Sequence, residues 1–359
     1  MPGLYIHIPF CKRKCNYCDF FSVEQSDFNV RGYLEALFVE LNNYKAFAPE
    51  TMYIGGGTPS LLDNENLTFI LENLRSRLDA TKVQEFTFEA NPESLHDSKL
   101  NILKEYGVNR LSLGLQSFSD NHLKNLGRVH TVDDFRSVYG RARLAGYSNI
   151  NVDIIYGLPN QQMTSFESEL EELMYLLPEH ISLYPLTIEH GTPFSFYKTE
   201  VNEDLQSEMF EKAISMLEKR GYRHYELSNW ALRGFESKHN LTYWKNMEYV
   251  GIGASAASYM GNKRTKNISD VNRYVEMIQA SGSAVCELDD IDQDTRLSEE
   301  IILNLRTADG VVLNDDMMEK YSFPVNKLIK ENLLTIDNDK IRLTQKGMLF
   351  ANRVFREFV

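Results

Sequence analysis

The sequence predicts an α/β fold, in which a partial (β/α)6 barrel is followed by a smaller, mostly helical, winged-helix-like C-terminal domain. Short β-like runs alternate with helical stretches six times through the first two thirds of the 359 residues, as in parallel sheets. Near residues 261–269 this rhythm gives way to a short polar stretch. With 43% hydrophobic residues, the chain has enough apolar material for a sizeable buried core.

The six predicted strands are rich in the β-branched, aromatic and other apolar residues that a buried sheet needs. They are expected at residues 4–8, 51–54, 85–89, 110–114, 149–155 and 180–185. A helical stretch follows each strand, at residues 30–44, 67–78, 98–106, 132–145, 165–176 and 205–220, and an aromatic segment follows at 222–230. This succession predicts a barrel domain at residues 1–230 and places the carboxyl ends of its strands at one rim.

The remainder of the chain is expected to be mostly helical, with one clear hairpin. Its strands are predicted at residues 333–336 and 340–343, joined by the turn Asp337-Asn338-Asp339 and followed by an amphipathic helix. Residues 289–359 hold 10 Lys and Arg against 14 Asp and Glu, so packing or docking is expected rather than DNA binding. We expect a connecting segment at 231–265 and a winged-helix-like domain at 266–359.

Charge and hydropathy restrict the partners and the location of the protein. The 38 Lys and Arg residues against 51 Asp and Glu give a formal net charge of −13, so no nucleic-acid partner is expected. No run approaches the roughly 18–20 apolar residues of a membrane-spanning helix. The first ten residues read as a strand rather than as a signal segment, so we expect a cytoplasmic protein.

Three of the four cysteines, Cys11, Cys15 and Cys18, form a C-x-x-x-C-x-x-C loop directly after the first predicted strand. Three thiolates on one tight loop are suited to three corners of a cubane iron–sulfur cluster, which leaves the fourth iron open to an external ligand. The basic run at 12–14 would offset the negative charge of such a cluster. A zinc site with nearby His7 as fourth ligand, or three unrelated buried cysteines, are the alternatives. The fourth cysteine, Cys286, is expected to be structural.

Polar or glycine residues stand at the carboxyl ends of the other predicted strands. The segment 55–57 is three consecutive glycines, which let bare backbone approach a ligand, and no Walker A sequence follows it. Glu89, Gln116 and Asp153 each fall at the end of a parallel strand, so their side chains should converge with the cysteine loop on one face of the barrel.

The cysteine spacing is similar to that of radical S-adenosylmethionine (SAM) enzymes, and several motifs resemble the oxygen-independent coproporphyrinogen III oxidase group. The motifs are Tyr-Ile-His-Ile-Pro-Phe-Cys at 5–11, Gly-Gly-Gly-Thr-Pro-Ser at 55–60, Phe-Glu-Ala-Asn-Pro at 88–92, Gly-Leu-Gln-Ser-Phe at 114–118 and Asn-Val-Asp-Ile-Ile-Tyr-Gly-Leu-Pro at 151–159. The resemblance covers nearly the whole chain. It implies a radical SAM barrel with a 4Fe–4S cluster on the three cysteines, SAM as a second cofactor, and an electron donor for the cluster.

The resemblance also implies how the barrel binds SAM. Gly56, Gly57 and Thr58 would hold the methionine amino group, and Arg128 would meet the methionine carboxylate. Glu89, Gln116 and Asp153 would receive the ribose hydroxyls and the amino group. Tyr5 and Tyr17 would lie beside the adenosyl group or the cluster.

Two features separate branches within the group. The oxidase has a further cysteine two residues after the third one, and this chain has Phe20 at that position. The oxidase also has an N-terminal extension ahead of its first strand, whereas this sequence starts at the predicted strand itself. Residues 239–244 match the His-Asn-x-x-Tyr-Trp signature of the haem-chaperone branch. That signature implies haem binding by His239, Asn240, Tyr243 and Trp244, with the imidazole as the leading iron ligand.

The expected function is therefore that of a haem chaperone that binds the cluster and SAM, accepts haem and passes it to apo-haemoproteins such as respiratory-chain proteins. The alternative is an oxygen-independent coproporphyrinogen III oxidase, which decarboxylates coproporphyrinogen propionates to give protoporphyrinogen IX. A third reading is a radical SAM enzyme with another substrate. Contact with a membrane, if any, is expected through a partner, because the chain has no obvious basic membrane patch.

Overall fold

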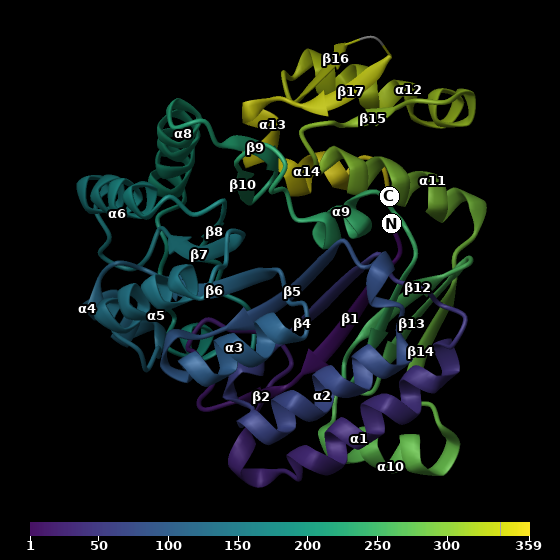
Figure 1. Cartoon of the computed structure of the whole chain (residues 1–359). Coiled ribbons are helices and arrows are strands. Elements are labelled where there is room, and N and C mark those ends of the chain that lie inside the picture. Colours follow the sequence, from purple (N-terminus) through teal and green to yellow (C-terminus); the bar gives the residue numbers. More distant parts are fainter. Residues whose placement is uncertain (338) are drawn as a thin grey trace.

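The computed structural model describes residues 1–337 and 339–359 and contains one large mixed sheet (Figure 1). Its strand order is β14-β13-β12-β11-β1-β4-β5-β6-β7-β8-β10-β9. Six neighbouring strands in the middle are all parallel to one another. They are β1 (Gly3–Ile8), β4 (Thr51–Gly56), β5 (Glu85–Ala90), β6 (Arg110–Gln116), β7 (Ile150–Tyr156) and β8 (His180–Pro185). The six predicted barrel strands are confirmed.

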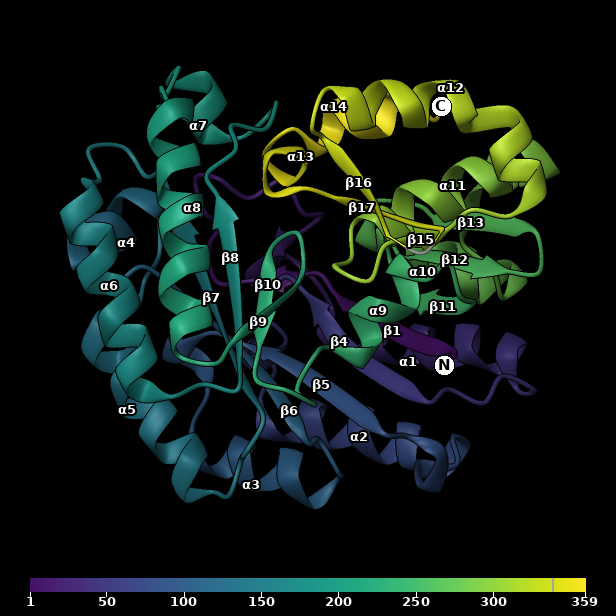
Figure 2. The same ribbon diagram turned by 90° about the horizontal axis from the view of Figure 1, so that it is seen from above.

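Helices follow these strands and cover the outer side of the curved sheet, as Figure 2 shows for α2, α3, α5 and α6. They are α1 (Val30–Leu41), α2 (Asn64–Arg77), α3 (Asp97–Glu105), α4 (Asp120–Leu126), α5 (Val132–Leu144), α6 (Met163–Leu176), α7 (Pro193–Phe196) and α8 (Glu203–Lys219). Local signals fix their ends. Asp63 accepts a hydrogen bond from the backbone of Asn66 to begin α2, and Thr131 forms a capping box with Asp134 to begin α5.

Short 3-10 turns and one small ladder connect these strands and helices. The turns are η1 (Gln25–Asp27), η2 (Asn42–Tyr44), η3 (Pro59–Leu61), η4 (Ala80–Lys82) and η5 (Pro92–Ser94). The ladder pairs β2 (Phe10–Cys11) with β3 (Val23–Glu24), so that the chain leaves β1, forms the cysteine loop and returns beside β2.

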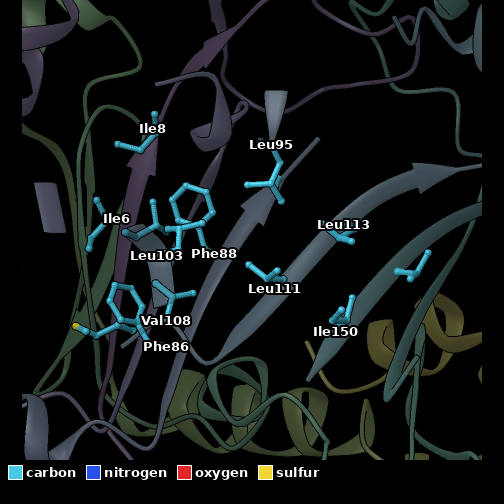
Figure 3. Packing of buried hydrophobic residues seen from close by; sticks show 14 of the residues in the cluster. Ile6, Ile8, Phe86, Phe88, Leu95, Leu103, Val108, Leu111, Leu113 and Ile150 are labelled. Atoms are coloured by element: carbon cyan, nitrogen blue, oxygen red, sulfur yellow. The ribbon is translucent and has the colours of Figure 1, made fainter. Parts of the chain in front are cut away.

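Side-chain alternation along the central strands separates an apolar outer layer from a polar interior. Ile6, Phe88 and Leu111 are fully buried in the outer layer, which packs against the helices (Figure 3). Because successive side chains point to opposite faces of a strand, the residues between them face the inside of the barrel. Tyr5, Tyr53, Glu89, Ser112 and Asp153 lie on this inner face. The barrel therefore presents polar groups to whatever it binds.

The sheet continues beyond β1 through the predicted connecting segment at 231–265 and into the region that the sequence predicts to be mostly helical. β11 (Tyr249–Ile252) is parallel to β1, and β12 (Ala257–Met260), β13 (Lys263–Asn267) and β14 (Val285–Asp290) follow in antiparallel order, with α10 (Val271–Ser281) between the last two. The prediction missed β13 and β14 because both are polar and largely exposed, with no alternating apolar pattern. The domain limits at residues 230 and 265 stay predictions.

The C-terminal region has a hydrophobic cluster of its own, which includes Ile301, Tyr321, Ile341 and Phe358. Its elements are α11 (Gln293–Leu305), β15 (Val311–Val312), α12 (Asp315–Lys330), β16 (Leu334–Asp337), β17 (Lys340–Leu343), α13 (Gln345–Leu349) and α14 (Ala351–Arg356). The predicted hairpin is confirmed, since β16 pairs with β17 in antiparallel register and β15 adds a third strand. Asn338 of the predicted turn lies outside the described residues.

The C-terminal region packs on a hairpin at the far edge of the sheet, formed by β9 (Arg223–Glu226) and β10 (Asn229–Ala231). The backbone N–H of Leu227 donates to the carbonyl of Arg306 at 3.0 Å, and that of Ala308 donates to the carbonyl of Tyr225 at 2.9 Å. Helix α9 (Lys238–Trp244) lies between this region and the barrel (Figure 2). Among the helices of residues 1–337 and 339–359, none is long and apolar enough to cross a lipid bilayer.

Candidate cluster and cofactor site

The three predicted cluster ligands lie on the loop that follows β1. Cys11 is buried at the end of β2, and Cys15 and Cys18 are half-buried and joined by a backbone hydrogen bond from Cys18 N to Cys15 O of 3.3 Å. The pKa of the Cys18 thiol is raised to about 11, mainly by burial and to a smaller extent by the neighbouring Cys15 and Cys11. The three sulfurs are therefore close enough to affect one another, and a metal that binds here has to displace protons.

Two hydrogen-bond donors point at these sulfurs, one from the segment after β4 and the other from the segment after α4. Thr58 Oγ1 lies 3.7 Å from Cys11 Sγ, and Arg128 Nη1 lies 3.7 Å from Cys15 Sγ. Asn91 joins the two donors, because its Nδ2 donates to Thr58 Oγ1 at 3.1 Å and its Oδ1 accepts from Arg128 Nη2 at 2.7 Å. One chain of hydrogen bonds thus runs from the first thiol to the second across the ends of β4, β5 and β6. The sequence argument gave Asn91 no role.

The donor set fits an iron–sulfur cluster better than a single zinc ion. Within residues 1–337 and 339–359, no three His, Cys, Asp or Glu side chains converge on one point as the ligands of one ion would. A cubane binds each cysteine through a different iron, so its three sulfurs do not have to converge. The proposed fourth zinc ligand is occupied, because His7 Nδ1 lies 2.9 Å from Tyr5 Oη and its Nε2 lies 2.9 Å from the carbonyl of Phe21.

The glycine segment brings β4 against the cysteine loop. Gly56 has a φ of +121°, and a Cβ there would lie 2.7 Å from the ring of His7. A Cβ on Gly57 would lie 2.8 Å from Phe10 O and 3.0 Å from Cys11 Sγ. The Gly57 and Thr58 N–H groups donate to the carbonyls of Ile8 and Phe10. An ammonium group only donates hydrogen bonds, so in this segment the carbonyls and the Thr58 hydroxyl are the groups that could accept from it.

Glu89 sits at the centre of the polar interior and is held on both oxygens. Tyr53 Oη donates to Oε1 at 2.6 Å, and the backbone N–H of Gly56 donates to Oε2 at 3.0 Å. Burial raises the pKa of Glu89 to about 7, and the nearby charge of Asp153 adds to this effect. A cationic ligand at this position would favour the charged form of the carboxylate. The amino group or the sulfonium of SAM would provide such a positive charge.

Asp153 and Gln116 lie on the neighbouring strands. Asn151 Nδ2 donates to Asp153 Oδ1 at 2.8 Å and Ser112 Oγ donates to Oδ2 at 3.2 Å, while burial raises the pKa of this carboxyl. Gln116 has a left-handed φ of 78°, at a shift of register between β6 and β7. A residue other than glycine is strained in that backbone conformation. Such strain is common at positions where a side chain points at a ligand.

The two predicted tyrosines lie on β1 and on the cysteine loop that follows it. Tyr5 is on the inner face of β1, with its ring 6.0 Å from that of Tyr53. Tyr17 packs against a small apolar cluster that includes Leu126 and Phe194. Burial raises the pKa of Tyr17, while the nearby Arg128 lowers it. The structure therefore brings both rings to the predicted site.

Arg110 is a second residue that the sequence argument missed. It lies on the inner face at the start of β6, is 2% exposed, and its Nε has no hydrogen-bond partner. The guanidinium lowers the pKa of both Glu89 and Asp153 against the larger effect of burial. We infer that this arginine supplies positive charge to the polar interior without pairing directly to either carboxylate.

The predicted haem motif lies on α9, which packs at the amino ends of β1 and β4 and so at the opposite end of the barrel from the cysteine loop. His239 is 1% exposed, its Nδ1 lies 2.9 Å from Thr51 Oγ1, and its Nε2 lies 2.8 Å from Tyr243 Oη. Burial lowers the pKa of His239 to about 3. Ligation of haem iron by this imidazole stays a prediction, and it would require one of the two hydrogen bonds to break.

The rest of the motif connects the barrel to the C-terminal region. The guanidinium of Arg306, at the end of α11, lies 4.5 Å from the ring centre of Trp244. The backbone N–H of Asn240 donates to Ser237 Oγ at 3.3 Å, which caps α9. The ring of His239 stacks on that of Tyr53 at 5.1 Å, and Tyr53 in turn binds Glu89. Tyr53 therefore links the motif to Glu89 of the predicted SAM site.

Comparisons with known proteins agree with this arrangement. Residues 5–173 match the radical SAM superfamily, and residues 291–350 match the HemN C-terminal domain. The solved structure of coproporphyrinogen III oxidase (HemN) from Escherichia coli, a radical SAM enzyme, superposes with a TM-score of 0.86 at 22% identity, over 99% of this chain and 90% of that one. At that identity the likeness shows a shared fold.

Curated relatives match over almost their whole length. The heme chaperone HemW of Lactococcus lactis is 37% identical, with 99% of this chain and 96% of that protein covered. The heme chaperone HemW of Bacillus subtilis is 38% identical, with 100% and 99% covered. These matches confirm the resemblance drawn from the motifs, and the chain belongs to the radical SAM superfamily and, within it, to the HemW family.

Proposed function

We propose that this protein is a haem chaperone, which binds haem and passes it to apo-haemoproteins. The observation that carries the proposal is the match, end to end, to proteins named heme chaperone HemW. The haem signature at residues 239–244 and the C-terminal region both lie inside the matched length. By the same resemblance, the acceptors are apo-haemoproteins such as respiratory-chain proteins, and the protein works in the cytoplasm, with membrane contact only through such partners.

We further propose that the barrel holds a 4Fe–4S cluster on Cys11, Cys15 and Cys18, and SAM beside it. Arg128 would meet the SAM carboxylate while it donates to Cys15, and Glu89 would meet a cationic group. Gly56, Gly57, Thr58, Gln116, Asp153, Tyr5 and Tyr17 complete the proposed SAM site. When bound, the cluster and SAM together supply one-electron reductive chemistry. The chain itself supplies hydrogen bonds to the sulfurs, a polar interior and exclusion of water.

The alternative, oxidative decarboxylation of coproporphyrinogen III, has less support. The structural likeness to HemN extends to the fold. Residue 20, which is a cysteine in the oxidase, is here a phenylalanine that is 68% exposed. This side chain cannot serve as a thiolate ligand, so the oxidase pattern is incomplete.

The test is a haem titration of the anaerobically reconstituted full chain, followed by mixing with an apo-haemoprotein. The proposal predicts a saturable Soret band and its transfer to the acceptor. Absence of haem binding would overturn the chaperone function. In a parallel sample with coproporphyrinogen III, SAM and a reductant, the proposal predicts no protoporphyrinogen IX, and its formation would establish the oxidase instead.

A further inference from the structure

Haem iron needs an axial ligand, and the eight histidines of the chain differ sharply in whether they can provide one. Six are largely or fully buried, and each of these has a ring nitrogen within 3.5 Å of a hydrogen-bonding partner. They are His7, His122, His130, His180, His224 and His239. In His7, His180 and His239 both ring nitrogens are hydrogen-bonded, so iron binding would break one of these bonds. The other three are hydrogen-bonded at one nitrogen, and the surrounding protein leaves little room for a porphyrin beside their rings. The two exposed histidines are His96 and His190.

The two exposed histidines have different surroundings. His96 lines a groove that also holds the charged side chains of Lys12, Glu93 and Lys99. His190 lies in the segment between β8 and α8, which also carries two of the most exposed aromatic side chains. Phe196 is 75% exposed and Tyr197 is 77% exposed. A porphyrin is a flat apolar disc, so it favours exposed aromatic faces over a groove that holds charged side chains.

The segment that carries His190 is folded and anchored. Thr192 Oγ1 donates to the carbonyl of Glu189 at 2.7 Å, and Thr199 N donates to the carbonyl of Phe194 at 3.0 Å. Phe194 is 6% exposed, and its backbone N–H donates to the carbonyl of Asn16 at 3.0 Å. These contacts hold the segment against the cysteine loop, so the exposed aromatic residues are presented beside that loop.

Positive charge is available for the two propionates of haem. Lys198 follows the exposed aromatic pair, and Lys12, Arg13 and Lys14 lie exposed on the adjoining cysteine loop. Throughout residues 1–337 and 339–359, the side chains of these four residues form no ion pair with an acidic group. In a chain with a net charge of −13, four exposed cations without an ion-pair partner, on two segments joined by the Phe194–Asn16 hydrogen bond, favour an anionic ligand.

We propose that haem binds on this surface, with His190 as axial ligand, Phe196 and Tyr197 against the porphyrin, and these cations near the propionates. The inference rests on the proposed haem-binding function and gives it a site other than the His-Asn-x-x-Tyr-Trp motif. An exposed ligand also suits transfer, because an acceptor can approach the haem without any opening of the barrel. The motif then stabilises the fold, through the contacts of His239 with Thr51 and Tyr53 and of Trp244 with Arg306.

The test compares haemin titrations of the reconstituted wild type, His190→Ala and the matched exposed control His96→Ala. We expect His190→Ala to bind haem about tenfold more weakly, with a shifted Soret band that added imidazole restores. His96→Ala should match the wild type. Phe196→Ser with Tyr197→Ser should weaken binding while the histidine-ligated spectrum is retained.

The outcomes separate this inference from the proposed function. If the wild type binds haem and His190→Ala shows the same affinity and spectrum, His190 is not the ligand and the inference is overturned. A loss of the histidine-ligated band in folded His239→Phe, with no change in His190→Ala, would overturn it in favour of the motif. If the wild type itself binds no haem, the chaperone function fails first. Circular dichroism of every variant verifies that it is folded.

Discussion

Asn91 shows how one side chain links the two thiols through strands that are far apart in the sequence. Its amide donates to Thr58 Oγ1 and accepts from Arg128 Nη2, and these two residues in turn point at Cys11 and Cys15. Asparagine can do this because its amide group is at once a donor and an acceptor. Aspartate at this position could accept from Arg128 but could not donate to Thr58.

We therefore expect Asn91→Ala to weaken both the fold and the cluster site. The buried Arg128 Nη2 keeps only the carbonyl of Gly114 as partner, so the free energy of unfolding should fall by about 1–3 kcal/mol. Urea unfolding measures this change, and iron content after reconstitution measures the loss at the cluster. Asn64→Ala, at an exposed position on α2, is the matched control. Equal stability and iron content in the two variants would contradict the assigned role of Asn91.

Glu89 makes the stability of the metal-free protein depend on pH. Its pKa is raised to about 7 by burial, so between its ordinary value of 4.5 and 7 the folded state binds more protons than the unfolded state. This carboxyl therefore stabilises the fold at low pH and loses its contribution as pH rises through 7. The neutral mimic Glu89→Gln should remove an effect of roughly 2–3 kcal/mol.

The comparison of wild type with Glu89→Gln isolates this residue from opposing groups. The buried His7, His224 and His239 have lowered pKa values, so their contribution to stability grows as pH rises toward 6.5. Urea midpoints at pH 5.5 and 7.5 for the two proteins measure the difference. Parallel pH profiles would show that Glu89 is charged at both values.

Helix α9 is the element whose role changes most between sequence and structure. The motif on this helix predicts contact with haem. In the structure, His239 is buried and its ring nitrogens are hydrogen-bonded to Thr51 and Tyr243, while Trp244 packs against Arg306. The helix thus joins the amino ends of the barrel strands to the C-terminal region. Spacing in a sequence identifies such a motif but does not tell which of its side chains stays accessible.

Removal of this imidazole should therefore destabilise the protein. In His239→Ala the hydroxyls of Thr51 and Tyr243 lose a buried partner and the ring leaves a cavity, so we expect a loss of about 2–4 kcal/mol in unfolding free energy. The exposed His96→Ala should change stability by less than about 0.5 kcal/mol. Chemical denaturation followed by tryptophan fluorescence measures both. A His239→Ala protein as stable as the wild type would contradict the framework role of α9.

The elements themselves were largely predictable where burial leaves a pattern. Each of the six central strands carries apolar residues on its outer face, and the cysteines, Glu89, Gln116 and Asp153 follow from their positions at strand ends. β13 and β14 could not be found in this way, because their own residues are mostly polar and show no alternating apolar pattern. Arg110 and Asn91 were missed because their roles depend on groups from strands far along the chain.

At the scale of the whole molecule, the proposed activities share one end of the barrel. The cysteine loop, the SAM residues and the exposed aromatic segment lie at the carboxyl ends of the strands, while α9 and the C-terminal region close the amino ends. Chemistry and haem exchange would therefore take place at one rim, and the opposite rim maintains the frame. This division holds only if the three cysteines do bind a cluster.

The most direct test is therefore the iron and acid-labile sulfide content of the anaerobically reconstituted protein, with electron paramagnetic resonance of the reduced sample before and after SAM is added. The account predicts about four irons and four sulfides per chain, a signal of a reduced cubane that SAM alters, and loss of both in Cys15→Ser. Substoichiometric iron without sulfide, or one zinc ion per chain, would contradict the central claim.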